Sequence, residues 1–252
     1  MLVALLWVLF AQLVFGVSHL SITSDEPSHV IAGLTYLKTG SLWVPPRHGH
    51  PPLLNALCAL PLVNQPGLPD LTASSGWGED FSSYVRAVLP QLSPVQRYAF
   101  LTRIPVILMT VLLASLTYRW AKELFGVASG IAALSLLTFD PNLLAHGQLA
   151  TTDLGVTLLG LVALYAAWRE SQSTRSTIRW MWVTVAGFFL GLTLASKGSG
   201  FVYAPAMGAI ITGPHFVVWL KERRIDNLGS LLIEGFVLAG IAGFLLWAVY
   251  GF

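Results

Sequence analysis

Long runs of apolar residues, separated by short polar segments, dominate the chain. A membrane-spanning helix needs about 20 mostly apolar residues, and the stretches that meet or approach this length are 1–21, 99–119, 126–144, 150–168, 178–196, 199–220 and 230–251. The third is the weakest, because its apolar core is short and Pro141 interrupts the helical pattern. The pattern predicts an all-α, polytopic membrane helix bundle of about seven spans.

A long and more polar segment, 22–98, separates the first two predicted spans. Residues 24–27 combine capping residues with an early proline and are typical of a helix start, and Gly40 is typical of a helix end. A second helix is expected over 50–60. We expect both to be amphipathic helices lying on the membrane surface, while 64–82, rich in Pro, Gly, Ser and Asp, predicts an exposed loop.

The composition agrees with a protein that is covered largely by lipid. Hydrophobic residues make up 55% of the chain and charged residues 10%, whereas a soluble domain carries about 25% charged residues. The small net charge of +2 therefore does not indicate nucleic-acid binding. Cys58 is the only cysteine, which excludes an intramolecular disulfide.

Basic residues predict how the spans are oriented. They cluster in three short connections, at Arg119, Lys122, Arg169, Arg175, Arg179, Lys221, Arg223 and Arg224. Short basic loops mark the cytoplasmic side, so the N-terminus is expected in the cytoplasm and both 22–98 and residue 252 outside. Residues 1–20 carry no charge, and we interpret them as a retained span; a cleaved signal peptide is the alternative.

Two adjacent carboxylates, Asp25 and Glu26, follow the first predicted span. Carboxylates beside a membrane are costly unless they are solvated, paired or used. One of them could act as a general base towards an acceptor hydroxyl while the other orients the acceptor or binds a cation. The alternative is that they only cap a helix and interact with its dipole.

Histidines lie close to this acidic pair. His29 follows Asp25 by four residues and so shares its helix face, and His48 and His50 come later in the segment. Acidic and imidazole ligands suit a divalent cation, for which Glu26 and His50 are the candidate ligands. The spacing fits no strong metal motif, and ordinary interfacial polar residues are the alternative.

Two cations and a further acid are expected at other outer span ends. Arg103 lies inside the outer part of the second span, Lys197 occupies a tight turn rich in Ser and Gly, and Asp153 begins the fourth span. An arginine at that depth needs a phosphate, carboxylate or headgroup partner. Snorkelling is the alternative for the cations, and helix capping for Asp153. Glu234, near the inner end of the last span, fits no part of this outer site.

Several of these residues carry a family resemblance. The chain resembles the protein O-mannosyltransferase-like family of GT-C membrane glycosyltransferases, which includes the bacterial lipid A aminoarabinose transferase. The matching positions are Asp25-Glu26-Pro27-Ser28-His29, Gly33, Tyr36, Gly40, His50-Pro51-Pro52-Leu53, Arg103, residues 141–147, Thr152-Asp153, Gly191-Leu192 and Ser196-Lys197.

The resemblance implies an inverting transfer of a hexose or pentose from a polyprenyl-phosphate donor to a hydroxyl of a protein or glycolipid, at the outer face of a bacterial inner membrane. It implies that Asp25 is the catalytic carboxylate and Glu26 its partner, that Arg103 and Lys197 contact the donor phosphate, and that His50 lies near the donor or a metal. His29 and Asp153 would support the site. No nucleotide-binding motif is present, and no nucleic-acid partner is expected.

Two features differ from the family pattern. Several relatives place His two residues after the Glu, whereas His29 lies three after Glu26. Family members are usually longer, so we expect 1–252 to form a single GT-C-like transmembrane domain that is a candidate N-terminal fragment. The alternative function is that of a non-enzymatic transporter or lipid-handling subunit, which would place its polar groups near the bilayer midplane.

Overall fold

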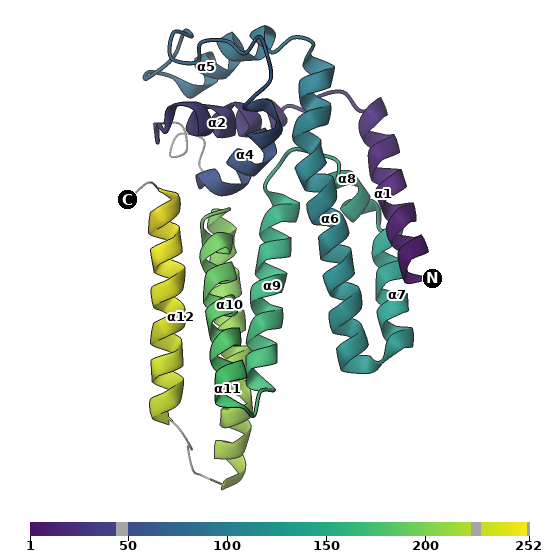
Figure 1. Ribbon diagram of the computed structural model, residues 1–252, viewed down its shortest axis with the longest axis vertical. Helices are drawn as coiled ribbons and strands as arrows, with labels where there is room; N and C mark the ends of the chain where they lie inside the picture. The colour runs from purple at the N-terminus through teal and green to yellow at the C-terminus, as the bar shows by residue number, and fades with distance from the viewer. Residues whose placement is uncertain (44–49, 223–227, 251–252) are drawn as a thin grey trace. The chain divides into compact units, whose positions relative to one another are not determined.

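The computed structural model describes residues 1–43, 50–222 and 228–250, and within them every regular element is helical (Figure 1). This confirms the predicted all-α class. The elements are α1 (Leu2–His19), α2 (Glu26–Thr39), α4 (Pro52–Ala59), η1 (Leu60–Leu62), α5 (Phe81–Val88), η2 (Leu89–Gln91), α6 (Val95–Phe125), α7 (Val127–Thr138), α8 (Pro141–His146), α9 (Asp153–Ser171), α10 (Ser176–Leu194), η3 (Gly198–Val202), α11 (Tyr203–Glu222) and α12 (Leu228–Val249).

Four helices in the described part of the chain are long and apolar enough to cross a membrane: α1, α6, α10 and residues Gly229–Val249 of α12. The predicted count of seven is not confirmed. The third predicted span is represented by α7, whose 12 residues extend about 18 Å, well short of the bilayer core of about 30 Å. The helices α9 and α11 have 19 and 20 residues, but they are not among the four candidate membrane spans.

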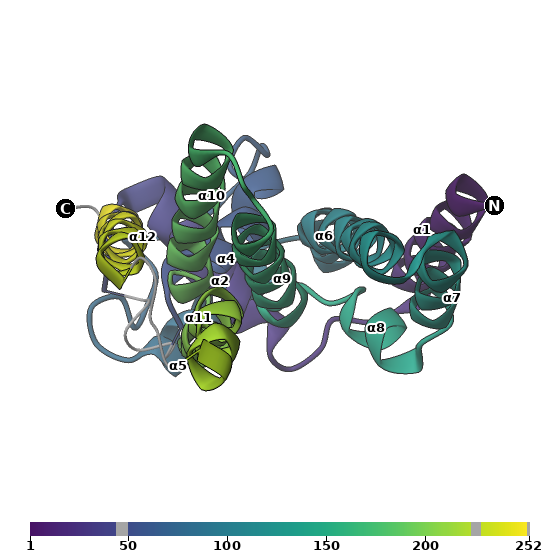
Figure 2. The same cartoon turned by 90° about the horizontal axis from the view of Figure 1, so that it is seen from below.

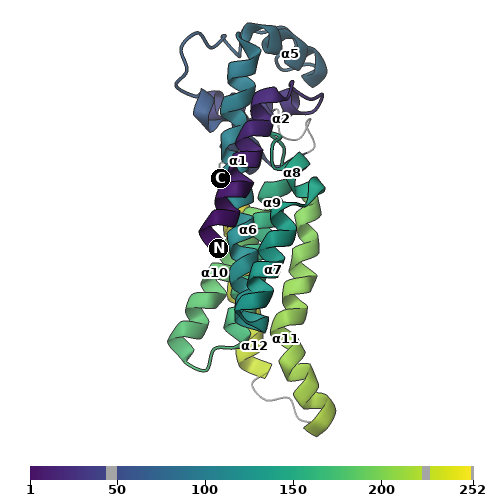
Figure 3. The ribbon, with the colours of Figure 1, turned by 90° about the vertical axis from the view of Figure 1, so that its right-hand side faces the viewer.

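The chain forms two compact units, Met1–Leu158 and Leu159–Phe252. Whether they act as the single domain expected from the sequence stays a prediction. In the first unit α6 is the longest helix, and α1 and α7 pack along it (Figures 1 and 3). The side chains of Leu9 and Leu13 on α1 are fully buried there. Near the N-terminal end of α6, a small helical cap is formed by α2, α4 and α5.

The helix α2 has the predicted ends but not the predicted surroundings. Gly40 ends it in the left-handed conformation at φ 65°, and its N–H donates to the Tyr36 carbonyl. The sequence predicts one buried and one polar face, yet nine of the ten residues from Glu26 to Thr35 are buried. The cause is close packing on several sides: a Cβ on Gly33 would lie 1.9 Å from the Asn55 carbonyl of α4, and the Thr35 hydroxyl contacts the Tyr84 hydroxyl of α5 at 2.9 Å.

In the second unit α10 lies between α9 and α12 (Figure 2). Two glycines one helical turn apart, Gly187 and Gly191, allow the backbones of α10 and α12 to approach closely. A Cβ on either would lie 2.9 Å from a carbonyl oxygen of α12, that of Leu238 or Ala242. Such small residues are typical of tightly packed membrane helices. Glu234 of α12 is also explained, since it pairs with Arg179 of α10 at 2.7 Å.

The close approach gives a direct test of this packing. Gly191→Ala should lower the unfolding midpoint of the detergent-solubilised chain, by the equivalent of about 1–3 kcal/mol, because the new methyl group meets rigid backbone. Gly240→Ala is the matched control, since it lies in α12 where a new methyl group would meet nothing within 4 Å and gains helix propensity. Equal effects of the two substitutions would contradict the packing.

Candidate functional site

The Glu26 carboxylate, at the first residue of α2, is fully enclosed and fully hydrogen-bonded. Its Oε1 accepts from Nε of Arg103 at 2.7 Å and from the backbone N–H of Ala150 at 2.8 Å. Its Oε2 accepts from Nη2 of Arg103 at 2.7 Å and from both the N–H and the hydroxyl of Thr23, at 2.9 and 3.0 Å. Five hydrogen bonds leave no free lone pair for a substrate or a metal ion.

The guanidinium of Arg103 is likewise occupied by hydrogen bonds within the protein. Besides its two bonds to Glu26, its Nη1 donates to the carbonyl of Leu20 at 3.0 Å and its Nη2 to that of Ser21 at 2.8 Å. The side chain is 1% exposed. The family resemblance implies that Arg103 contacts a donor phosphate, but here its guanidinium joins α6 to the connection between α1 and α2. A phosphate contact would require this network to open.

The network also sets the protonation state of Glu26. Burial alone raises the pKa of its carboxyl, but the hydrogen bonds from Arg103, Ala150 and Thr23, with the positive charge of Arg103, outweigh burial and hold the pKa below its ordinary value of 4.5. Glu26 is therefore an ionised anchor at neutral pH. It has neither the accessibility nor the proton affinity that favour a general base.

Asp25, the neighbouring carboxylate, has the opposite environment. It occupies the N-cap position of α2 and is exposed, yet its side chain makes no capping hydrogen bond. The Ser24 hydroxyl donates one long hydrogen bond, at 3.4 Å, to its Oδ1. The backbone carbonyl of Asp25 accepts from the N–H groups of Ser28 and His29, which fixes the start of the helix. The Asp25 carboxylate is therefore exposed, and the helix start that carries it is held in place by backbone hydrogen bonds.

Histidine and amide side chains meet between α2 and the start of α4. His29 is buried, and its Nδ1 lies 2.9 Å from Oδ1 of Asn55. The rings of His29 and His50 stack with centroids 5.3 Å apart. Asn55 was not among the expected site residues. His48 lies outside the described residues.

No group of three or more His, Cys, Asp or Glu side chains is arranged for a metal ion within the described ranges. A divalent cation at Glu26 and His50 stays a prediction, and Glu26 has its oxygens already occupied. Cys58 is not available as a nucleophile or ligand either, because burial, with a contribution from the charge of Glu26, raises its pKa to about 12.

Asp153 belongs to the same unit. It is the first residue of α9, and its Oδ2 lies 3.9 Å from Nδ1 of His146, both side chains being partly exposed. The segment just before it is tied to the site through the Ala150 bond to Glu26. Lys197, the N-cap residue of η3, belongs to the second unit. Its participation in a common site stays a prediction.

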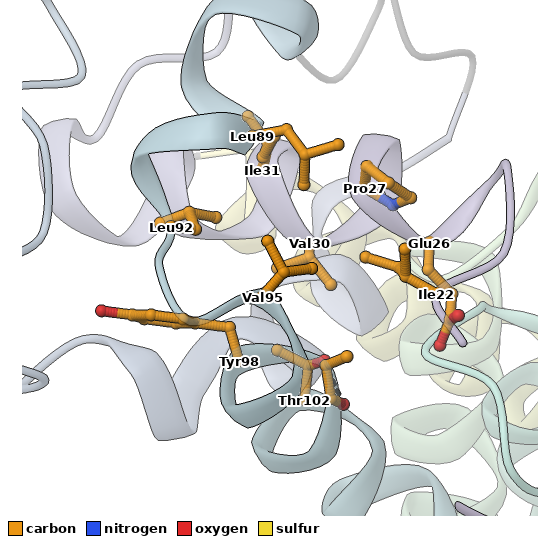
Figure 4. Close-up of a pocket in the computed structure, with 11 residues that line it drawn as sticks. Ile22, Glu26, Pro27, Val30, Ile31, Leu89, Leu92, Val95, Tyr98 and Thr102 are labelled. Carbon is orange, nitrogen blue, oxygen red and sulfur yellow. Dashed lines mark hydrogen bonds between the residues drawn. The ribbon is translucent and has the colours of Figure 1, made fainter. Parts of the chain in front are cut away.

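A small cavity adjoins the anchor on its apolar side, with a volume of about 20 Å³ (Figure 4). Such a volume holds about one water molecule and cannot hold a sugar. Its lining combines residues of α2, η2 and α6, including Pro27, Val30, Leu89 and Tyr98. This cavity is part of the packing around Glu26 and is not a substrate site.

One sequence signal could have assigned Glu26 its role. A Thr followed three residues later by Glu is the capping-box pattern, in which the Glu carboxylate reaches back to the backbone N–H of the Thr. Thr23 and Glu26 make this bond, although the helix itself begins later. No local pattern indicates the partners Arg103 and Ala150, which lie 77 and 124 residues further along the chain.

The family model of dolichyl-phosphate-mannose-protein mannosyltransferases matches residues 49–251, which is most of the chain. The matched region contains Arg103, Asp153 and Lys197 but starts after α2, so Asp25 and Glu26 lie outside it. No curated protein and no solved structure matches the chain.

The buried pair predicts a large and local cost of mutation. Arg103→Met should lower the free energy of unfolding by about 3–5 kcal/mol, because it leaves a buried carboxylate without its counter-charge. Arg97→Met is the matched control on the same helix, since Arg97 is exposed and its side chain donates to Gln65, which is a surface contact; it should change stability by less than about 0.5 kcal/mol. Denaturant unfolding in detergent measures both, and equal losses would contradict the anchoring role.

The lowered pKa of Glu26 predicts how stability depends on pH. Because the folded-state pKa lies below the ordinary value of 4.5, the ionised carboxylate stabilises the fold fully above that value and loses this contribution as the pH falls through the folded-state pKa. The stability difference between the wild type and Glu26→Gln should therefore be constant near neutrality and shrink on acidification. Unfolding midpoints measured from pH 7 to about pH 3 test this, and a difference that grows in acid would refute it.

Proposed function

This chain belongs to the dolichyl-phosphate-mannose-protein mannosyltransferase family, and we propose that it transfers a sugar from a polyprenyl-phosphate donor to an acceptor hydroxyl with inversion at the anomeric carbon. Membership makes it a membrane-embedded glycosyltransferase. Mannose is the first donor sugar to test. The acceptor, a protein or a glycolipid, and the outer location of the site are parts of the proposal.

The observation that carries the proposal is the division of labour between two adjacent carboxylates. Glu26 points inward and is saturated, whereas Asp25 is exposed on the same rigid helix start. We therefore assign the base to Asp25 and give Glu26 and Arg103 a positioning role. Neighbouring carboxylates that are separated in this way by their environments commonly divide roles in active sites.

The proposed reaction proceeds in one displacement. Asp25 takes the proton of the acceptor hydroxyl, and the acceptor oxygen attacks the anomeric carbon on the face opposite the phosphate. The bond between that carbon and the phosphate oxygen breaks, and polyprenyl phosphate leaves with the electron pair. A cation stabilises the charge on the leaving phosphate, and Lys197 is the candidate. His29, His50 and Asp153 are proposed to support the acceptor or donor, with or without a divalent cation.

Asp25→Asn should reduce sugar transfer by about 100-fold or more, because the amide cannot accept the proton. The measurement uses the full chain in lipid nanodiscs, polyprenyl-phosphate mannose as the donor, and the rate at which polyprenyl phosphate is released. Asp80→Asn is the matched control, since Asp80 caps α5 through the N–H of Ser83 and asparagine caps equally well.

Membrane insertion and the unfolding midpoint should be unchanged in Asp25→Asn, because Asp25 is exposed and makes no capping bond. Wild-type release of polyprenyl phosphate by this variant would remove Asp25 from the catalytic role. Loss of activity in Asp80→Asn as well would show that the assay reports folding instead of proton transfer.

A further inference from the structure

The second unit contains a buried cluster of charged side chains that the proposed reaction does not use. Arg179 of α10 donates from Nε to Oε1 of Glu170 on α9 and from Nη2 to Oε2 of Glu234 on α12, both at 2.7 Å. Glu170 and Glu234 are 2% and 5% exposed. One guanidinium thus serves two buried carboxyl groups.

One oxygen of this cluster has no hydrogen-bond partner in the described part of the chain. Oε2 of Glu170 is buried and accepts from no side chain or backbone group there. Leaving a buried charged acceptor unsatisfied is costly. Besides Arg179 and Glu234, His215 of α11 interacts electrostatically with Glu170. Within the described residues, two acidic side chains therefore share one guanidinium, and one of their oxygens has no donor.

The carboxylates Glu170 and Glu234 line a cavity of about 270 Å³ between the helices of this unit. The remaining lining comes from α10, α11 and α12 and is almost entirely apolar: Val183, Leu190, Ala204, Met207, Gly208, Ile211, Thr212, Leu231, Gly235, Leu238 and Ala239. An apolar cavity of this size favours a hydrocarbon group over water. Two of its walls, α10 and α12, are long and apolar enough to span a membrane.

We propose that this cavity binds a primary ammonium group attached to an apolar chain, with the ammonium at the acidic end that Glu170 and Glu234 form. The ammonium brings hydrogen-bond donors and a positive charge to the two acidic side chains, and its chain fills the apolar part. An aminophospholipid headgroup and a free alkylamine share this chemistry. The site is independent of the proposed sugar transfer and of Asp25.

The test compares ligands that differ in one property each. In detergent, hexylammonium should raise the unfolding midpoint of the full chain by about 3–5 °C at ten times its dissociation constant. Hexyltrimethylammonium keeps the charge without an N–H donor, and hexanol keeps a donor without the charge; neither should produce the shift. Nanodiscs of phosphatidylethanolamine and phosphatidylcholine repeat the contrast between donor and non-donor headgroups, and a shift there identifies the lipid as the source.

Two variants locate the site. Glu170→Gln keeps an oxygen for Nε of Arg179 but replaces the unsatisfied acceptor by an NH₂ donor, so it should abolish the hexylammonium shift. Gly208→Leu extends a side chain into the cavity, where an added Cβ would meet nothing within 4 Å, and should abolish the shift while Arg179 keeps its contacts. Glu123→Gln, on an exposed ion pair of α6, should leave it unchanged.

Equal midpoint shifts with the ammonium, the trimethylammonium and the alcohol would overturn the proposal, whatever the variants do. So would a shift that survives both Glu170→Gln and Gly208→Leu. If Glu170→Gln does not fold, the Gly208→Leu result and the comparison of ligands on the wild type still decide the question.

Discussion

The first unit depends on one buried ion pair, Glu26 with Arg103. Three parts of the chain that are distant in sequence meet at it: the connection from α1 to α2, the N-terminal part of α6, and the segment that leads into α9. Burying two charges is favourable only when their remaining hydrogen-bonding groups are also satisfied. Here backbone N–H and carbonyl groups complete the set, so the pair is stable only when all three parts are in place.

This anchor explains how two adjacent carboxylates acquire different chemistry. Successive residues at a helix start point in different directions, so fixing Glu26 inward against Arg103 directs Asp25 outward. The first becomes an ionised structural group, and the second keeps the exposure that a general base needs. The sequence predicted Asp25 as the catalytic carboxylate and Glu26 as its partner, with helix capping as the alternative for both, because residue type and spacing do not distinguish a saturated carboxylate from an accessible one.

Local patterns predicted local structure well. Apolar runs and the stop at Gly40 indicated the helical class and the end of α2, since both depend on residues within one or two turns. Pairing across 77 residues, the burial of α2 between α4 and α5, and the glycine contact of α10 with α12 were not predicted. Each depends on which helices become neighbours, which periodicity does not encode. Length explains one of the three unconfirmed spans, since α7 is apolar but only 12 residues long, whereas α9 and α11 have 19 and 20 residues.

The two buried charge clusters differ in one quantity, the balance of donors and acceptors. Around Glu26 every carboxylate oxygen is matched, partly by backbone groups that no ligand displaces at low cost. Around Arg179 two carboxylates share one guanidinium, and within the described residues one oxygen of Glu170 is left over beside an apolar cavity. A matched cluster holds helices together and gains nothing from a ligand. An unmatched cluster carries a free-energy cost, and this cost is the reason for proposing a cationic donor as the ligand of the second cluster.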